Sequence, residues 1–232
     1  MKSPLPSLLL VSSIVFAPFA AVAQTAPTAS VAKEPALTPA QINQGFKSGL
    51  TTIVNQALTP TAIKVPAPKL FAEAEAPLVK ANKAAIYQRF NAALTETVNK
   101  TTPRAAELIK NAVKDLKIED ATPLLSGSSD AGTQFLRKAV QASVREALLP
   151  IIKQAATGAG LAVKAREVFS TLDAAGVKGG AKAISDLEEH VYKQVIDQSF
   201  KQIAQREAAV RAQPDLLTGN ALGQKVFALA KK

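Results

Sequence analysis

The chain has 232 residues, a net charge of +10 at pH 7, a single histidine and no cysteine. The lack of cysteine excludes disulfide bonds, thiolate nucleophiles, cysteine metal sites and the lipid-modified cysteine of a bacterial lipoprotein. The positive charge favours anionic partners, although lysines dispersed along a chain can also serve solubility alone.

The N-terminus has the pattern of a cleavable signal peptide. Lys2 supplies the charged region, an apolar stretch runs from Leu8 to Ala20, and Ala21-Val22-Ala23 forms a small-residue cleavage site. A membrane anchor needs about 20 unbroken apolar residues, and Pro18 interrupts this shorter stretch. We therefore predict that residues 1–23 are removed during export and that the mature protein is periplasmic, without a lipid anchor.

A spacer and a first helix follow. Residues 24–37 are rich in Ala, Pro and Thr and lack an amphipathic period, which predicts a disordered spacer. Thr38 is then a candidate N-cap, with Pro39 at the first helical position. The apolar stripe of this helix comprises Ile42, Phe46, Leu50, Ile53, Val54 and Ala57.

The middle of the chain predicts an extended crossing and then several helices joined by short loops. Pro60, Pro66 and Pro68 keep residues 59–69 out of a helix. Thr102 is a candidate N-cap that starts a new helix at Pro103. The helices predicted from apolar periodicity are Leu70–Leu78, Asn82–Asn99, Pro103–Leu116 and Ile118–Leu125.

The second half predicts two long helices and two shorter ones. The first long helix covers about 130–157 and contains Pro150; a shorter one covers about 161–174, before a glycine-rich break at 176–180. Ser185 and Glu188 have the spacing of a capping box for the second long helix, which ends before Pro214. Thr218 is the predicted start of the last helix.

No segment alternates β-branched and polar residues over a strand's length, so the predicted fold class is all-α. Short loops favour antiparallel neighbours. We expect residues 38–232 to form a single bundle-like domain of about eight helices.

Catalytic and metal-binding constellations are not expected. His190 is the single histidine, and it lies opposite the apolar stripe of its helix, which disfavours a Ser-His-Asp arrangement or a histidine-based metal site around it. The alternatives are a metal bound by Asp186 and His190 at i, i+4, and a Ser-Lys dyad. On this charged face we expect ion pairs of Glu189 with Lys193 and of Asp197 with Lys201. We therefore predict no catalytic residues, no bound metal and no cofactor.

Two surfaces are candidates for contact with anions. Arg137, Gln141, Arg145 and Lys153 share a helix, with the first three spaced at i, i+4 and i+8, and could meet phosphates; the alternative is an ordinary solvated face. The turn Ser128-Ser129-Asp130 could hold an anion at a helix N-terminus, and simple helix capping is the alternative.

Several stretches, taken in order and spacing, resemble the bacterial family called domain of unknown function 4197. The resemblance spans about residues 44–227 and is carried by Ile63-Lys64-Val65-Pro66-Ala67-Pro68, Ile118-Glu119-Asp120-Ala121, Leu125-Ser126-Gly127, the run from Asp130 to Arg137, Pro150-Ile151-Ile152-Lys153, Asp186-Leu187-Glu188 with Tyr192, and Ile203-Ala204-Gln205-Arg206-Glu207 through to Pro214. It implies an envelope-associated helical protein of Gram-negative bacteria with no assigned activity or site. Some similar proteins carry a lipoprotein cysteine, which this chain lacks.

These observations favour a non-enzymatic periplasmic module that binds a protein or another component of the cell envelope. The alternative is peripheral binding to anionic lipid or an envelope polymer through basic helix faces. Export argues against nucleic acid as the partner.

Overall fold

The structure is a computed structural model that describes residues 36–59, 65–173 and 180–231, and Leu37–Lys232 forms one compact unit. The described residues contain nine α-helices and no strand, which confirms the all-α prediction. In chain order the helices are α1 (Pro39–Ala57), α2 (Lys69–Lys80), α3 (Ala84–Lys114), α4 (Thr122–Ser126), α5 (Ala131–Gly158), α6 (Leu161–Asp173), α7 (Gly180–Ser185), α8 (Leu187–Ala212) and α9 (Ala221–Ala228), with the 3₁₀ turns η1 (Pro214–Leu216) and η2 (Leu229–Lys231). The predicted signal peptide, most of the spacer and residues 176–179 of the predicted break lie outside the described residues.

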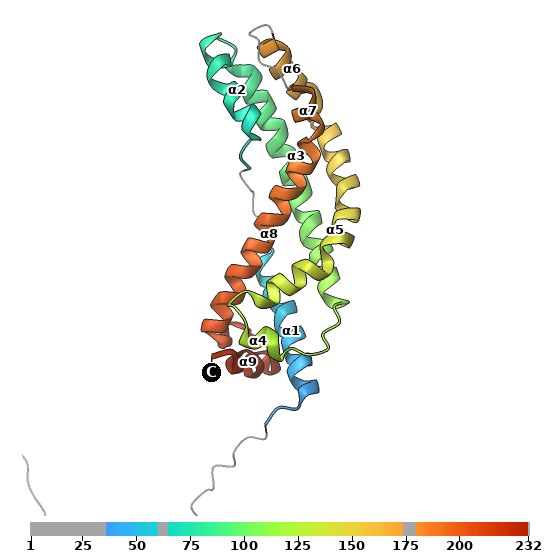
Figure 1. Ribbon diagram of the computed structural model, residues 1–232, viewed down its shortest axis with the longest axis vertical. Coiled ribbons are helices and arrows are strands. Elements are labelled where there is room, and N and C mark those ends of the chain that lie inside the picture. Colours follow the sequence, from blue (N-terminus) through green and yellow to red (C-terminus); the bar gives the residue numbers. More distant parts are fainter. Residues whose placement is uncertain (1–35, 60–64, 174–179, 232) are drawn as a thin grey trace, which may run out of the picture. The chain divides into compact units, whose positions relative to one another are not determined.

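Three long helices, α3, α5 and α8, pack side by side and carry most of the core (Figure 1). Helices α1, α4 and α9 lie together at one end of this unit, while α2, α6 and α7 lie at the other end (Figure 1). None of the described helices combines the length and the apolar character that a bilayer span requires.

The first helix follows its predicted pattern. Thr38 caps α1, and its hydroxyl and the side chain of Gln41 form a complete capping box. Leu50, Ile53 and Val54 on the predicted stripe are fully buried. After α1, residues 65–68 lie outside any helix, as their prolines require, and residues 60–64 lie outside the described part of the chain.

The predicted break before Pro103 is wrong, because α3 runs without interruption from Ala84 to Lys114. Proline removes one backbone donor, a loss that ordinarily favours a helix end. Here the helix surface around the proline is buried, since Thr97 and Thr101 are inaccessible to solvent and their hydroxyls donate to the carbonyl oxygens of Ala93 and Thr97. Thr101 before Pro103 and Ala105 after it are both fully buried, so packing continues across the proline and outweighs the missing hydrogen bond.

Two predicted helix starts are also wrong. The Ser185 hydroxyl donates to the carbonyl of Lys182 and so belongs to the end of α7, while α8 begins at Leu187 without a side-chain cap. The last helix starts after Asn220 rather than at Thr218, because the Asn220 side chain accepts a hydrogen bond from the amide of Gly223. Asparagine is among the best N-cap residues.

Other predicted elements are confirmed with shifted ends. The helix predicted at 118–125 is reduced to the five residues of α4, and α2, α5 and α6 match their predictions within a few residues. The positive φ of 63° at Gly160 separates α5 from α6, a conformation that glycine adopts without strain. The predicted apolar stripe of α8 is buried along its whole length: Leu187, Val191, Val195, Ile196, Phe200, Ile203 and Val210.

Two glycines allow α1 and α9 to approach closely. A Cβ atom added to Gly45 would lie 2.4 Å from Val226 Cγ2, and one added to Gly49 would lie 2.5 Å from Phe227 Cε2. The Phe227 ring in turn stacks on Phe46 with ring centroids 5.4 Å apart. The contact between the first and last helices thus depends on the missing side chains of these two glycines.

We predict that Gly49→Val lowers the free energy of unfolding by about 1–3 kcal/mol, because the added methyl groups displace the buried Phe227 ring. Gly158→Ala is the matched control: a Cβ atom there meets nothing within 4 Å, so the stability stays constant or rises slightly. Urea unfolding of both variants measures the difference, and equal stabilities would contradict the packing described for α1 and α9.

Candidate functional site

The two arginines of the predicted basic stripe on α5 form ion pairs with α8. Arg137 forms an ion pair with Asp197 and its guanidinium lies 5.5 Å from the centroid of the Phe200 ring. Arg145 donates to Glu189 at 2.7 Å, in a partly exposed ion pair. The ion pairs expected within α8 are therefore wrong: Glu189 and Asp197 turn to arginines of α5, whose longer side chains reach across the helix interface.

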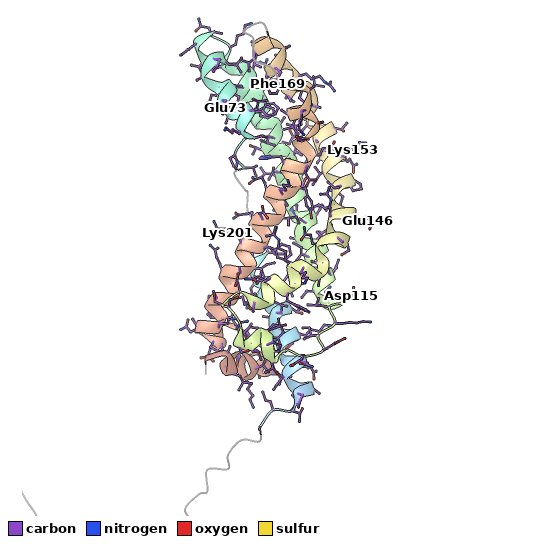
Figure 2. All side chains as sticks on the ribbon, in the orientation of Figure 1. Glu73, Asp115, Glu146, Lys153, Phe169 and Lys201 are labelled. Carbon is purple, nitrogen blue, oxygen red and sulfur yellow. The ribbon has the colours of Figure 1, made fainter. Side chains whose placement is uncertain are left out.

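The other two residues of the stripe, Gln141 and Lys153, are exposed on α5. Figure 2 shows Lys153 and Glu146 on the outer edge of that helix. The stripe therefore divides into two arginines engaged with α8 and two side chains in solvent.

Between the two ion pairs lies a buried tyrosine. The Arg145 guanidinium is 5.1 Å from the centroid of the Tyr192 ring, and the Tyr192 hydroxyl is buried with no hydrogen-bond partner. Burial raises the pKa of this phenol. An orphaned hydroxyl is an energetic cost that the packing of the ring must outweigh.

The second predicted anion site, at Ser128-Ser129-Asp130, makes its hydrogen bonds within the chain. Ser128 Oγ donates to Asp130 Oδ1 at 2.8 Å, and the side chain of Gln134 donates to the same oxygen at 2.9 Å. Hydrogen bonds from Gln134 and then Ser128 hold the pKa of Asp130 below its ordinary value. The next backbone amides of α5 are also occupied, by a group from α8.

That group is Glu207, whose side chain is fully buried. Its Oε1 atom accepts from the amide of Gly132 at 3.0 Å, and its Oε2 atom accepts from both the amide and the hydroxyl of Thr133 at 2.6 Å. The N-terminus of a helix favours a negative charge through its free amides and its dipole. The chain therefore supplies its own anion to the start of α5.

Arg211, one turn further along α8, neutralises this carboxylate. Its guanidinium donates to Glu207 Oε1 from Nε at 3.0 Å and from Nη2 at 2.7 Å. It also donates to the carbonyl oxygens of Leu124 and Leu125 at the end of α4. The pair thus joins α8 to α4 and α5, and we call Glu207, Arg211 and these partners the buried ion-pair network.

Sequence reasoning missed this network. Glu207 follows Ile203 by four residues and so lies on the buried stripe of α8, and Arg211 follows Glu207 by four residues. A carboxylate and a guanidinium at this spacing on an apolar face are the signal that could have revealed a buried pair.

His190 is also engaged. Its Nε2 atom lies 3.0 Å from the carbonyl oxygen of Pro66, so the ring contacts the segment that precedes α2. The expectation of a wholly solvated face is corrected by this contact, since His190 is only partly exposed. No group of three or more potential metal ligands of the His, Cys, Asp or Glu type occurs among the described residues.

An open groove of about 600 Å³ lies between the C-terminal part of α3 and the middle of α5. Its lining is mostly apolar or small and comprises Leu108, Ala112, Asp115, Leu116, Lys117, Ala139, Val140, Ser143, Val144 and Ala147. A hollow of about 630 Å³ over α3 is lined by polar side chains such as Asn91, Glu96 and Lys100. A cavity of about 180 Å³ near the start of α6 is smaller than ordinary ligand pockets, which begin at about 300 Å³.

The groove borders a surface of α5 that is rich in small side chains. Six exposed residues, which we call the outer face of α5, combine one cation and one anion with small side chains: Lys138, Ala139, Ala142, Ser143, Glu146 and Ala147. By contrast, the exposed residues of α8 before its last turn are all polar: Lys193, Asp197, Lys201 and Gln205. A polar exterior is the rule for a helix that packs on one side only.

The model of the family described as "Protein of unknown function (DUF4197)" matches residues 36–228. The chain belongs to this family. The DUF4197 match begins before α1 and ends at the last residue of α9, so it covers the entire set of described α-helices and confirms the resemblance noted in the sequence. No curated protein and no solved structure matches the chain.

We predict that Glu207→Gln lowers the free energy of unfolding by about 3–5 kcal/mol, because it leaves the Arg211 charge buried without a counter-charge. Arg104 and Glu107 form the control, since their ion pair is exposed and its loss in Glu107→Gln costs at most about 1 kcal/mol. Denaturant unfolding measures both variants. The double variant Glu207→Gln/Arg211→Met is expected to lose less than the sum of the single losses, and strict additivity would mean that the two groups do not interact.

We predict that Tyr192→Phe raises the free energy of unfolding by about 1 kcal/mol at neutral pH, because it removes a buried hydroxyl without a partner. The raised pKa of Tyr192 means that folded and unfolded chains both hold the proton below about pH 10; above it the unfolded chain loses its proton first, and stability falls.

Unfolding curves at neutral and alkaline pH test this, since Tyr192→Phe lessens the alkaline loss. Tyr87→Phe leaves Tyr192 as the single tyrosine of the chain, so its titration can be followed by phenolate absorbance. If Tyr192 titrates at the ordinary pKa of tyrosine in that variant, the claim that burial raises its pKa is wrong.

Proposed function

We propose that this protein is an exported, non-enzymatic interaction module of the cell envelope that binds a protein partner through the outer face of α5 and the adjoining groove. The observation that carries the proposal is the exposure of Ala139, Ala142 and Ala147 in the middle of a long helix whose opposite side is buried in the core.

Small side chains suit such a surface for physical reasons. Alanine loses no side-chain entropy when it is buried, and it lets the backbone of a partner helix approach closely. The apolar lining of the groove adds area whose burial contributes about 25 cal/mol per Å². A polar rim remains at Asp115 and Lys117, in keeping with the polar edges of protein interfaces.

Export is part of the proposal and is supported by the sequence alone. The charged residue, apolar stretch and small-residue site of residues 1–23 have the order of a signal peptide, and a chain without cysteine tolerates an oxidising compartment. A binding role rather than catalysis is supported by how the ionisable groups are used. Glu207 and Arg211 hold helices together, and His190 contacts a backbone carbonyl.

The alternative of binding to anionic lipid through the basic stripe is less well supported. Arg137 and Arg145 would have to leave their acidic partners on α8 to meet phosphates, and each would also lose a contact with an aromatic ring. The proposal therefore places the partner on the small-residue side of α5 rather than on its arginine side.

Site-specific photo-cross-linking in cells tests the proposed surface. A cross-linking residue at Ser143 is expected to give a discrete protein adduct, whereas one at Gln141, exposed on a different side of α5, gives none. Ala139→Arg is expected to reduce the Ser143 adduct about tenfold, which corresponds to a loss of about 1.4 kcal/mol. Equal adducts at the two positions, or an adduct indifferent to Ala139→Arg, would rule out this surface.

Cell fractionation tests export separately. The protein in the periplasmic fraction is expected to begin at Gln24, by N-terminal sequencing. An uncleaved chain in the cytoplasm would overturn the envelope assignment and leave the binding surface to be judged on the cross-linking alone.

A further inference from the structure

The outer side of α5 is complementary to itself when read in opposite directions. Counting from Ala142, Lys138 lies four residues before it and Glu146 four residues after it; Phe135 and Leu149 lie seven residues before and after it. The order is thus apolar, cation, alanine, anion, apolar. Two copies of this helix laid antiparallel place each cation opposite an anion and each large apolar residue opposite another.

These five residues share one side of the helix. At about 100° per residue, Lys138 and Glu146 lie within about 40° of Ala142, and Phe135 and Leu149 lie within about 20°. Lys138, Ala142 and Glu146 are exposed. Phe135 and Leu149 are half-buried, so each retains apolar area that a partner can cover.

The two central charges are available for such a contact. Among the described residues, neither Lys138 nor Glu146 takes part in an ion pair, whereas Arg137 and Arg145 on the same helix each pair with α8. Figure 2 shows Glu146 on the outer edge of α5. The arginines that α5 turns toward α8 are paired within the described part of the chain, whereas Lys138 and Glu146 are not.

We propose that the partner on the outer face of α5 is a second copy of this chain, packed antiparallel about a two-fold axis at Ala142. Lys138 of each copy then lies opposite Glu146 of the other, and the contact is isologous, as in most homodimers. Ala142 at the axis lets the two helices pack within the separation of ordinary helix pairs, which reaches about 10 Å. This inference rests on the proposed function and names its partner.

Sedimentation of protein purified from cells that express the full chain tests the proposal. The wild type is expected to be a dimer. Lys138→Glu and Glu146→Lys each place like charges together at two symmetric positions and are expected to weaken the dimer at least tenfold, since such contacts cost several kcal/mol. The double variant Lys138→Glu/Glu146→Lys restores opposite charges and is expected to return the affinity to near the wild-type value.

Ala142→Arg is expected to give a monomer, and Gln141→Arg, its exposed neighbour off this side of the helix, is expected to remain a dimer. Thermal unfolding of each variant checks that it is folded. A wild-type monomer, a dimer that both single reversals leave intact, or a folded double variant that stays monomeric would overturn the proposal.

Because the natural chain has no cysteine, a single introduced cysteine gives an independent test. Ala142→Cys places two sulfurs at the axis, where Cβ atoms about 4 Å apart suit a disulfide. Mild oxidation is expected to yield a covalent dimer from Ala142→Cys and none from Gln141→Cys, and the reverse result would exclude this geometry.

The cross-link at Ser143 separates this inference from the proposed function. An adduct with the mass of two copies supports the dimer. A monomeric protein with a Ser143 adduct of another mass overturns the dimer and leaves the outer face of α5 as the surface for a different protein. A monomeric protein that gives no adduct at Ser143 overturns both the dimer and the proposed binding surface.

Discussion

The carboxylate of Glu207 determines how the C-terminal part of α8 packs against the start of α5 and the end of α4. A fully buried charge is unfavourable unless it is paired and hydrogen-bonded, and here five hydrogen bonds converge on it from α5 and Arg211. These directional contacts fix α8 against the start of α5 and the end of α4. Apolar packing alone would permit small rotations of one helix against another, whereas this arrangement specifies one register.

The same network explains why a helix N-terminus that looks suited to an anion is not simply open to solvent. The amides of Gly132 and Thr133 point at Glu207, and Gly132 has no room for a side chain, since a Cβ atom would lie 2.9 Å from both Glu207 and Phe46. The backbone of α5 must therefore approach α8 closely for the hydrogen bonds to form. The glycine and the buried glutamate are two parts of one contact.

Apolar periodicity was sufficient to predict the all-α fold and most of the long helices, because burial of one side of a helix leaves a repeating trace in the sequence. It failed where a local rule competed with packing. Pro103 and Thr102 have the local signature of a helix start, yet the buried threonines around them keep α3 continuous. The Ser185 capping box failed for a similar reason, since its hydroxyl bonds backward to Lys182. The pairing of Arg137 and Arg145 with α8 depends on how two helices are placed side by side, and no pattern within one helix contains that information.

The packing of α9 on α1 joins parts of the chain that are far apart in sequence. Asn220 caps α9, and its side chain also forms hydrogen bonds with Ser48 and Thr52 on α1. These two hydrogen bonds join residues that are 172 and 168 positions apart in the sequence. Contacts between distant residues form late and slow folding, because a long loop must close before they contribute. A chain made from its N-terminus therefore carries the glycine side of α1 without its α9 cover until the last helix is complete, while α3 and α8 cover other parts of α1. During that interval the apolar residues of α1 that α9 later covers are open to contact with other chains, which favours aggregation.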